Sequence, residues 1–107
     1  MIMRTQKSSN GIIFTLSGVL HQTDFLDLEE KIQQLMYKGI FEFTLDFSKV
    51  KNLEPEGINL LVEREKRLKA YGGGLHLVGI SPYLYQLFCL IGASQVFEFK
   101  INYKKKI

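Results

Sequence analysis

The chain has 107 residues, of which 46% are hydrophobic and 23% charged. This length fits one domain and is too short for two separate cores, so we expect a single domain over residues 1–107 with its core over about 1–99. The composition is ordinary for a globular protein and excludes a disordered chain. No apolar run reaches the roughly 20 residues that span a bilayer, so we expect no membrane insertion.

Positive charge is gathered at the C-terminal end of the chain. The formal net charge is +3, and residues 100–107 hold four lysines and no acid, which leaves 10 basic and 11 acidic residues over 1–99. A nucleic-acid-binding domain is expected to carry a basic face within its fold, so we expect no nucleic-acid partner. The basic tail is typical of a solvated terminus, and a weak attraction to an acidic partner or membrane surface is the alternative.

Two short strands are predicted at the start of the chain. Residues 11–17 are rich in β-branched and aromatic side chains, and apolar positions alternate with more polar ones, which indicates one core-facing side. A turn signal at 9–11 joins this strand to a weaker one at 1–6 as a hairpin. Gly18 is expected to end the second strand.

A helix is predicted over residues 24–38, because its apolar residues recur at helical spacing. Acidic residues crowd its first two turns, where the helix dipole favours them. Gly39 stands where a left-handed residue commonly ends a helix. Residues 40–47 then alternate apolar and polar side chains as a strand, and a short polar turn is expected after it.

The second helix is expected from about Pro55 to Tyr71. Its opposite side is a run of mixed charge in which Glu63–Arg67 and Glu65–Lys69 are i,i+4 pairs, so we expect that side to be solvated. Its apolar stripe is predicted to be core and consists of Ile58, Leu61, Val62, Leu68 and Tyr71.

A further strand is predicted at residues 75–80, and the third helix follows it. Ser81 is a suitable N-cap, Pro82 suits the first helical position, and Gly92 ends the helix. A last strand is expected at 96–99. The order β-β-α-β-α-β-α-β predicts an α/β fold with a mixed, mostly parallel β-sheet, right-handed crossovers and about three helices largely on one face.

No pattern of side chains points to catalysis, a cofactor or a metal. The two histidines, His21 and His76, have no Cys, His or Asp at ligand spacing, and His76 is expected on the mixed face of a strand. Asp46 is expected to accept hydrogen bonds from the turn amides of 48–49. Glu54 is expected to favour the N-terminus of the second helix. We therefore expect that the chain is not an enzyme.

The single cysteine, Cys89, excludes an internal disulfide and fits a reducing compartment, so we expect a cytoplasmic location. It lies beside apolar helix positions, which indicates a half-buried structural thiol. A reactive thiol would need basic neighbours or a helix N-terminus.

Residues 45–57 read LDFSKVKNLEPEG and resemble the signature of the STAS domain, the fold of bacterial anti-sigma factor antagonists. In that family a strand ends in Asp-Leu-Ser or similar, and Asp-Ser-Ser-Gly or Asp-Ser-Thr-Gly then opens a helix. Here Asp46, Ser48 and Gly57 carry the motif. Residues 73–82 are similar to the family's Gly-Gly-x-Leu-x-Leu-x-Gly-Ile-Ser-Pro segment, and the resemblance extends over about 11–99.

The resemblance implies a non-enzymatic switch protein that acts in signal transduction and transcription regulation by partner switching. Such a protein binds an anti-sigma factor, often a serine kinase-like regulator, and so frees the sigma factor. The kinase phosphorylates the serine after the motif aspartate, at the start of the second helix. A helix N-terminus accommodates a phosphate, but a charge near −2 in the docking surface opposes binding.

This sequence departs from the family at the regulated position, which Pro55 occupies. Proline has no hydroxyl group, so it cannot be phosphorylated; Glu54 replaces the aspartate and Glu56 the second hydroxyl residue. Three interpretations stay open. The domain binds its partner without phospho-regulation, or Glu56 acts as a fixed charge in place of the phosphate, or the role differs, as in an accessory subunit of a membrane lipid transporter or a scaffold.

By the same resemblance, the partner-binding surface is expected at the turn and first helical turn of residues 51–60, with the turn at 21–23 adding to it. The partner-binding residues predicted in this way are Asn52, Glu54, Pro55, Glu56, Gly57, Asn59 and Glu63.

Overall fold

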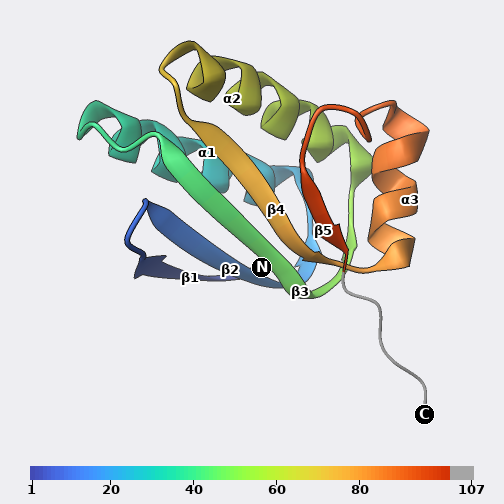
Figure 1. Cartoon of the computed structure of the whole chain (residues 1–107). Coiled ribbons are helices and arrows are strands. Elements are labelled where there is room, and N and C mark those ends of the chain that lie inside the picture. The colour runs from blue at the N-terminus through green and yellow to red at the C-terminus, as the bar shows by residue number, and fades with distance from the viewer. Residues whose placement is uncertain (102–107) are drawn as a thin grey trace.

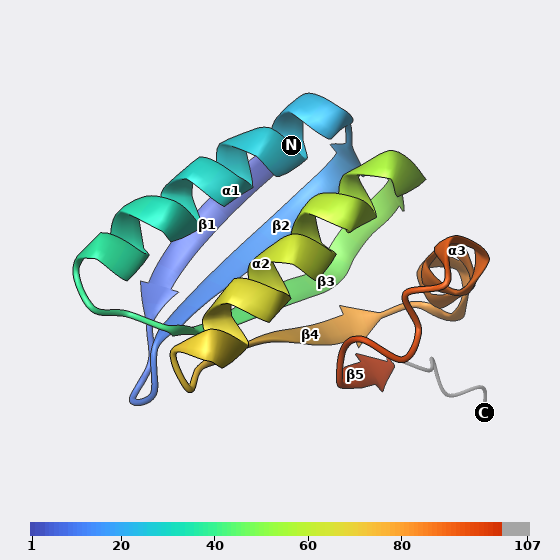
Figure 2. The same ribbon diagram turned by 90° about the horizontal axis from the view of Figure 1, so that it is seen from above.

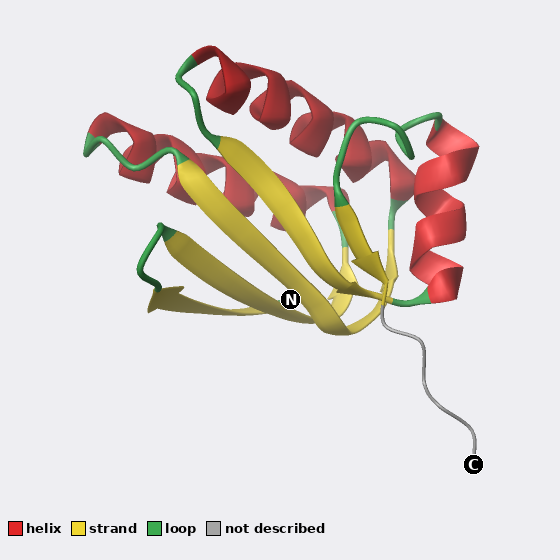
Figure 3. Ribbon diagram, viewed as in Figure 1, coloured by secondary structure: helices red, strands yellow, loops and turns green. Residues whose placement is uncertain are grey.

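A computed structural model describes residues 1–101 and shows one sheet with three α-helices (Figure 1). Four strands form the body of the sheet, and a fifth of three residues closes one edge, in the order β1-β2-β3-β4-β5. Figure 3 distinguishes strands and helices by colour. The elements in chain order are β1 (Ile2–Lys7), β2 (Ile12–Leu20), α1 (Gln22–Tyr37), β3 (Glu42–Leu53), the 3-10 helix η1 (Pro55–Gly57), α2 (Ile58–Ala70), β4 (Gly74–Ile80), α3 (Pro82–Ile91) and β5 (Phe99–Ile101).

The mixed, mostly parallel sheet predicted from the sequence is confirmed. β1 and β2 pair antiparallel as a hairpin, whereas the pairs β2–β3, β3–β4 and β4–β5 are parallel. Parallel neighbours need a crossover, and each is made by a helix. Figure 2 shows α1 and α2 side by side over one face of the sheet, with α3 at its β4–β5 end. The other face of the sheet has no helix among the described residues.

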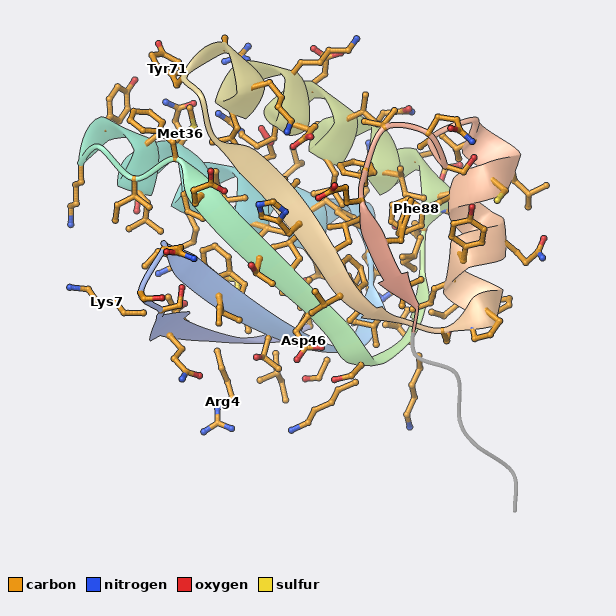
Figure 4. The ribbon with its side chains drawn as sticks, viewed as in Figure 1. Arg4, Lys7, Met36, Asp46, Tyr71 and Phe88 are labelled. Carbon is orange, nitrogen blue, oxygen red and sulfur yellow. The ribbon has the colours of Figure 1, made fainter. Side chains whose placement is uncertain are left out.

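The core lies between the sheet and the helices. Phe14, Leu45 and Leu77 are fully buried on three adjacent strands, as the period-two patterns predict. α3 belongs to the same core, because its Phe88 meets the ring of Phe47 edge to face with the ring centroids 6.3 Å apart. Figure 4 shows Phe88 between α3 and the sheet. All three helices therefore pack on one face.

Two strands run further than the sequence predicts. β2 continues past Gly18, which has a φ of 89° and lies at an irregularity in the register rather than at the strand's end. β3 extends through the expected polar turn to Leu53. Between the pairs Thr15–Asp46 and Ser17–Lys49, β3 contains one residue more than β2, which is the signature of a β-bulge. The bulge rotates the strand, so that Val50 and Leu53 are buried in place of alternate residues.

The second helix differs from its prediction in two ways. Its first turn is the separate 3-10 helix η1, and the run of mixed charge is not a solvated face throughout. Arg64 and Glu65 are only 5% and 7% exposed, and the Glu65 carboxylate accepts a 2.7 Å hydrogen bond from the backbone N–H of Leu75. Tyr71, predicted as core, is exposed and stacks on Phe41.

At the C-terminal side, the caps of α3 are confirmed and the last strand is shifted. The Ser81 hydroxyl accepts a hydrogen bond from the N–H of Leu84 at 3.1 Å, and Gly92 is left-handed with a φ of 82°. The strand predicted at 96–99 instead begins at Phe99, because the chain forms a turn in which the N–H of Val96 donates to the carbonyl of Ala93. Cys89 is exposed, so its prediction as half-buried was wrong.

Candidate functional site

The predicted partner-binding residues lie where β2 and β3 end and where α1 and η1 begin. β2 leads directly into α1, and the backbone N–H of Glu54 donates to the carbonyl of Leu20 at 2.8 Å. The two chain segments are therefore joined at this end of the sheet. We call the exposed side chains at this end the tip surface; they are His21, Gln22, Asn52, Glu54, Glu56 and Asn59.

Glu54 has a different partner from the one predicted. It makes no side-chain bond to its own helix, and its Oε1 instead accepts a 2.6 Å hydrogen bond from the backbone N–H of Gln22. The same oxygen lies 3.8 Å from Nδ1 of His21. The first N–H groups of a helix lack intrahelical partners, so Glu54 satisfies one of them in α1. It thereby fastens the start of α1 to the start of η1.

Pro55, Glu56 and Gly57 form the 3-10 turn that precedes α2. Pro55 takes the first position, where its missing N–H costs nothing. The Glu56 side chain is exposed and lies in the first turn. Gly57 is buried, and a Cβ at this position would overlap the ring of Phe25. The glycine thus allows η1 to lie directly on α1.

Asp46 accepts a hydrogen bond from one of the two backbone amides predicted for it. It does so inside β3 rather than at the end of the strand. Its Oδ1 accepts from the N–H of Ser48 at 2.9 Å, across the bulge. A Cβ at Gly79 of the neighbouring strand would lie 2.8 Å from that oxygen. Asp46 alternates with core residues and so faces away from the helices (Figure 4). The motif residues Asp46 and Ser48 therefore shape the bulge that leads β3 to the tip surface.

A contact that the sequence did not predict ties α3 to this site. The Tyr83 hydroxyl donates to Oδ1 of Asn52 at 2.9 Å, and the same oxygen accepts from the N–H of Leu53 at 2.8 Å. Asn52 is therefore held by two hydrogen bonds, and Tyr83 borders the tip surface. No local sequence pattern around Tyr83 could predict this contact, because Asn52 lies 31 residues earlier in the chain.

Along α2, the predicted division between core and surface is confirmed for most positions. Asn59 and Glu63 are exposed, whereas Ile58 and Leu61 are fully buried and Val62 is partly buried. Glu63 lies 3.9 Å from Lys66, an exposed pair that contributes little to stability. The exposed side of the first α2 turns is thus continuous with the tip surface.

The tip surface presents two carboxylates, three amides and one imidazole, from Glu54, Glu56, Gln22, Asn52, Asn59 and His21. Within residues 1–101 no group of three or more His, Cys, Asp or Glu side chains could hold a metal ion. A hollow of about 450 Å³, lined by Glu42, Thr44 and His76 among others, lies near the start of β3, at the opposite end of the strand from the tip. There His76 contacts Glu42 at 2.9 Å.

A comparison with protein-family models identifies the family of this chain. A family model described as "Mlab, STAS domain" matches residues 3–99. The chain belongs to the STAS domain family. In the described part of the chain no helix has both the length and the apolar character needed to cross a membrane.

Solved STAS-fold structures are similar to this chain at low sequence identity. The anti-sigma factor antagonist SpoIIAA in its unphosphorylated form matches at a TM-score of 0.79 and 17% identity, over 92% of this chain and 87% of that one. An anti-sigma factor antagonist from Mycobacterium paratuberculosis matches at 0.77 and 18%, over 92% and 84%. A sulfate transporter family protein from Wolinella succinogenes matches at 0.68 and 19%, over 83% and 75%. No curated protein matches the chain by sequence.

Proposed function

We propose that this STAS domain is a non-enzymatic protein-binding module that acts like an anti-sigma factor antagonist in the regulation of transcription. Its partner is an anti-sigma factor or a serine kinase-like regulator, bound at the tip surface. The likeness to two anti-sigma factor antagonists over most of the chain supports this function. The continuity of the tip surface with the exposed side of α2 supports the place of binding.

The observation that supports the proposal most directly is that Pro55 lies in a helix start whose neighbours, Glu54 and Gly57, both contact α1. The Glu54 carboxylate accepts a 2.6 Å hydrogen bond from the backbone N–H at the start of α1, and Gly57 packs against the ring of Phe25. These two contacts hold the helix start in place, while the residue at the family's serine position has no hydroxyl group. The module binds its partner without phosphorylation at this position.

A second interpretation assigns Glu56 the role of a permanent negative charge. Two carboxylates stand at this turn, but Glu54 already accepts a hydrogen bond from Gln22. Glu56 is thus the carboxylate available to a partner. A single carboxylate carries less charge than a phosphate and fewer acceptor oxygens, so we favour binding over permanent inhibition.

The alternative function is that of an accessory STAS subunit in a membrane lipid transporter, or of a scaffold in a larger signalling assembly. The description of the matching family model and the similarity to a sulfate transporter family protein support it. Copurification separates the two functions, because an anti-sigma factor supports the first and a transporter ATPase the second.

Replacing Pro55 by serine tests the proposed kinase type of the partner. With the serine kinase-like regulator of the same organism and radiolabelled ATP, we expect no phosphate on residues 54–57 of the wild-type chain and stoichiometric labelling of Pro55→Ser. The scaffold already presents this position at the start of a helix, where a phosphate is accommodated.

Asn59→Ser, which adds a hydroxyl one turn further along the exposed side of α2, is the matched control and should stay unlabelled. Failure to label Pro55→Ser by a kinase that binds the chain would show that the partner does not act on this position.

A further inference from the structure

A small hollow lies at the end of the molecule opposite the tip surface, where α1 and α2 end and β3 begins. Its volume is about 110 Å³, and we call it the base hollow. An apolar cavity of about 150 Å³ takes up a benzene molecule, so the base hollow has room for one apolar side chain. Figure 4 shows two of its residues, Met36 and Tyr71, at this end. The residues that line it are Gln33, Met36, Tyr37, Phe41 and Tyr71.

Three aromatic rings line the base hollow. The rings of Phe41 and Tyr71 are stacked, with their centroids 4.9 Å apart and their planes 10° apart. Tyr37 and Tyr71 are 84% and 66% exposed, although both are large side chains. Tyrosine is enriched among the residues that dominate binding at protein interfaces, because it gives a large contact area at a low cost in conformational entropy. Exposed rings around a recess are therefore suited to contact with a partner.

The polar groups of the base hollow are hydrogen-bond donors. The amide oxygen of Gln33 accepts a 2.8 Å hydrogen bond from Arg64, so the two N–H groups of that amide remain for a partner. The hydroxyl groups of Tyr37 and Tyr71 bond to no other described residue. No carboxylate of residues 1–101 lines the hollow. The base hollow is thus suited to a partner that is rich in acceptors.

Two exposed cations border the base hollow. Arg67 lies four residues before Tyr71, on the same side of α2, and Lys38 directly follows Tyr37. Within the described part of the chain neither cation forms an ion pair. Glu63, the predicted partner of Arg67, instead lies 3.9 Å from a different lysine. Both charges are therefore available to an anionic partner.

Two carboxylates lie near this end of the molecule, but neither cancels the charge of these cations. Glu42 follows Phe41 and alternates with the core residues of β3, so it faces the side of the sheet that α1 and α2 do not cover. There it contacts His76 at 2.9 Å. Glu30 precedes Tyr37 by seven residues, which is about 10 Å along α1. The border of the base hollow is therefore positive.

We propose that the base hollow binds an acidic segment of a second protein, with one apolar side chain of that segment held among the aromatic rings. A side chain anchored in a pocket dominates the energy of such a contact. Carboxylates on either side of the anchor accept from Gln33 and pair with Arg67 and Lys38. This surface goes beyond the proposed function, because the tip surface lies at the opposite end and stays free for its own partner.

A nucleic acid and a membrane are less well matched to the base hollow than an acidic protein segment. The affinity of a protein for nucleic acid rises with the number of phosphates that it neutralises, and two cations neutralise few. Apolar side chains that enter a membrane project into it, whereas the rings here line a recess. An acidic segment with an apolar anchor uses the recess and the cations together.

Fluorescence anisotropy with labelled peptides tests the proposal on the full chain. The probes are peptides of about nine residues, in which Glu and Asp flank a central Leu, Ile, Met, Phe or Trp. We expect at least one of them to bind with a dissociation constant of about 10–500 µM, since one anchor and a few charges give a modest affinity. Peptides with a central Ser, or with Lys in place of the acids, should bind at least about tenfold more weakly.

Two substitutions, each with a matched control, locate the binding. Tyr37→Ala should weaken it by at least about tenfold, and Arg67→Gln by about three- to fivefold at low salt. Leu90→Ala removes a side chain of similar exposure, 81%, from α3. Lys66→Gln removes a cation that is 70% exposed and lies next to Arg67 in sequence. Both controls should stay within about twofold of the wild type.

Absence of binding by every acidic peptide up to about 2 mM would overturn the proposal. So would peptide binding that Tyr37→Ala and Arg67→Gln leave unchanged, because the contact would then lie elsewhere. Binding of oligodeoxythymidylate or of phosphatidylglycerol vesicles in place of every peptide would also overturn it. None of these results bears on the tip surface, so the proposed function is tested separately.

Discussion

Replacing Gly57 by alanine is expected to lower the free energy of unfolding by at least about 2 kcal/mol. The added Cβ would overlap the ring of Phe25, which is only 1% exposed and cannot swing into solvent without leaving the core. Domains of this size are stable by about 5–15 kcal/mol, so the loss is large. Urea denaturation followed by circular dichroism measures it, with an unchanged slope as the sign of two-state unfolding.

Gly74→Ala is the matched control for this prediction. Gly74 is also buried, but its added Cβ would meet no atom closer than 3.5 Å, the ammonium nitrogen of Lys69. Its unfolding free energy should therefore stay close to that of the wild type. In a Phe25→Leu background, where the ring is absent, Gly57→Ala should lower the unfolding free energy by less than it does in the wild-type background, since the two sites are in contact. Equal effects of Gly57→Ala and Gly74→Ala would contradict the proposed packing of η1 on α1.

Replacing Arg64 by alanine is expected to lower the unfolding free energy by about 3 kcal/mol. Its guanidinium holds both carboxylate oxygens of Glu29, at 3.0 and 2.8 Å, and donates to Gln33 at 2.8 Å. These bonds join α2 to α1 while Arg64 itself is 5% exposed. Removing the arginine leaves the Glu29 carboxylate, whose side chain is 20% exposed, without its partner, and unpaired buried charge is costly.

Two further variants show whether geometry or charge is responsible. Arg64→Lys keeps the charge but cannot form the bidentate contact with Glu29. Its unfolding free energy should therefore lie between those of the wild type and Arg64→Ala. Lys66→Ala removes a cation two residues away whose side chain is 70% exposed, and it should change the unfolding free energy by less than about 0.5 kcal/mol. The same small effect for Arg64→Ala would mean that the contact with Glu29 does not stabilise the fold.

The sequence predicted the fold because its local signals agree with one another. Alternating apolar residues marked the strands, and Ser81, Pro82 and Gly92 marked the ends of α3, as the structure confirms. The extension of β3 to Leu53 was not predictable in this way. Its burial changes from every second to every third residue at the bulge, and a bulge depends on the register with β2 rather than on β3 alone.

The place of the partner-binding site stays a prediction, and the contacts of its residues were not all predicted. The motif resemblance located the start of the second helix, and the structure brings it next to the start of α1. Local rules assigned Glu54 to its own helix, whereas it bonds to Gln22, 32 residues earlier. The burial of Arg64 was missed for a related reason. A run of alternating charges normally indicates a solvated face, and the partner of Arg64, Glu29, lies 35 residues away.

The central proposal is that the tip surface binds its partner with no phosphate switch at Pro55. The direct measurement is a calorimetric titration of the serine kinase-like anti-sigma factor from the same organism with the wild-type chain, before and after incubation of the two with magnesium and ATP. We predict binding in both cases, with dissociation constants that agree within about twofold. No measurable binding before incubation would contradict the proposal, because the tip surface would then not bind this partner.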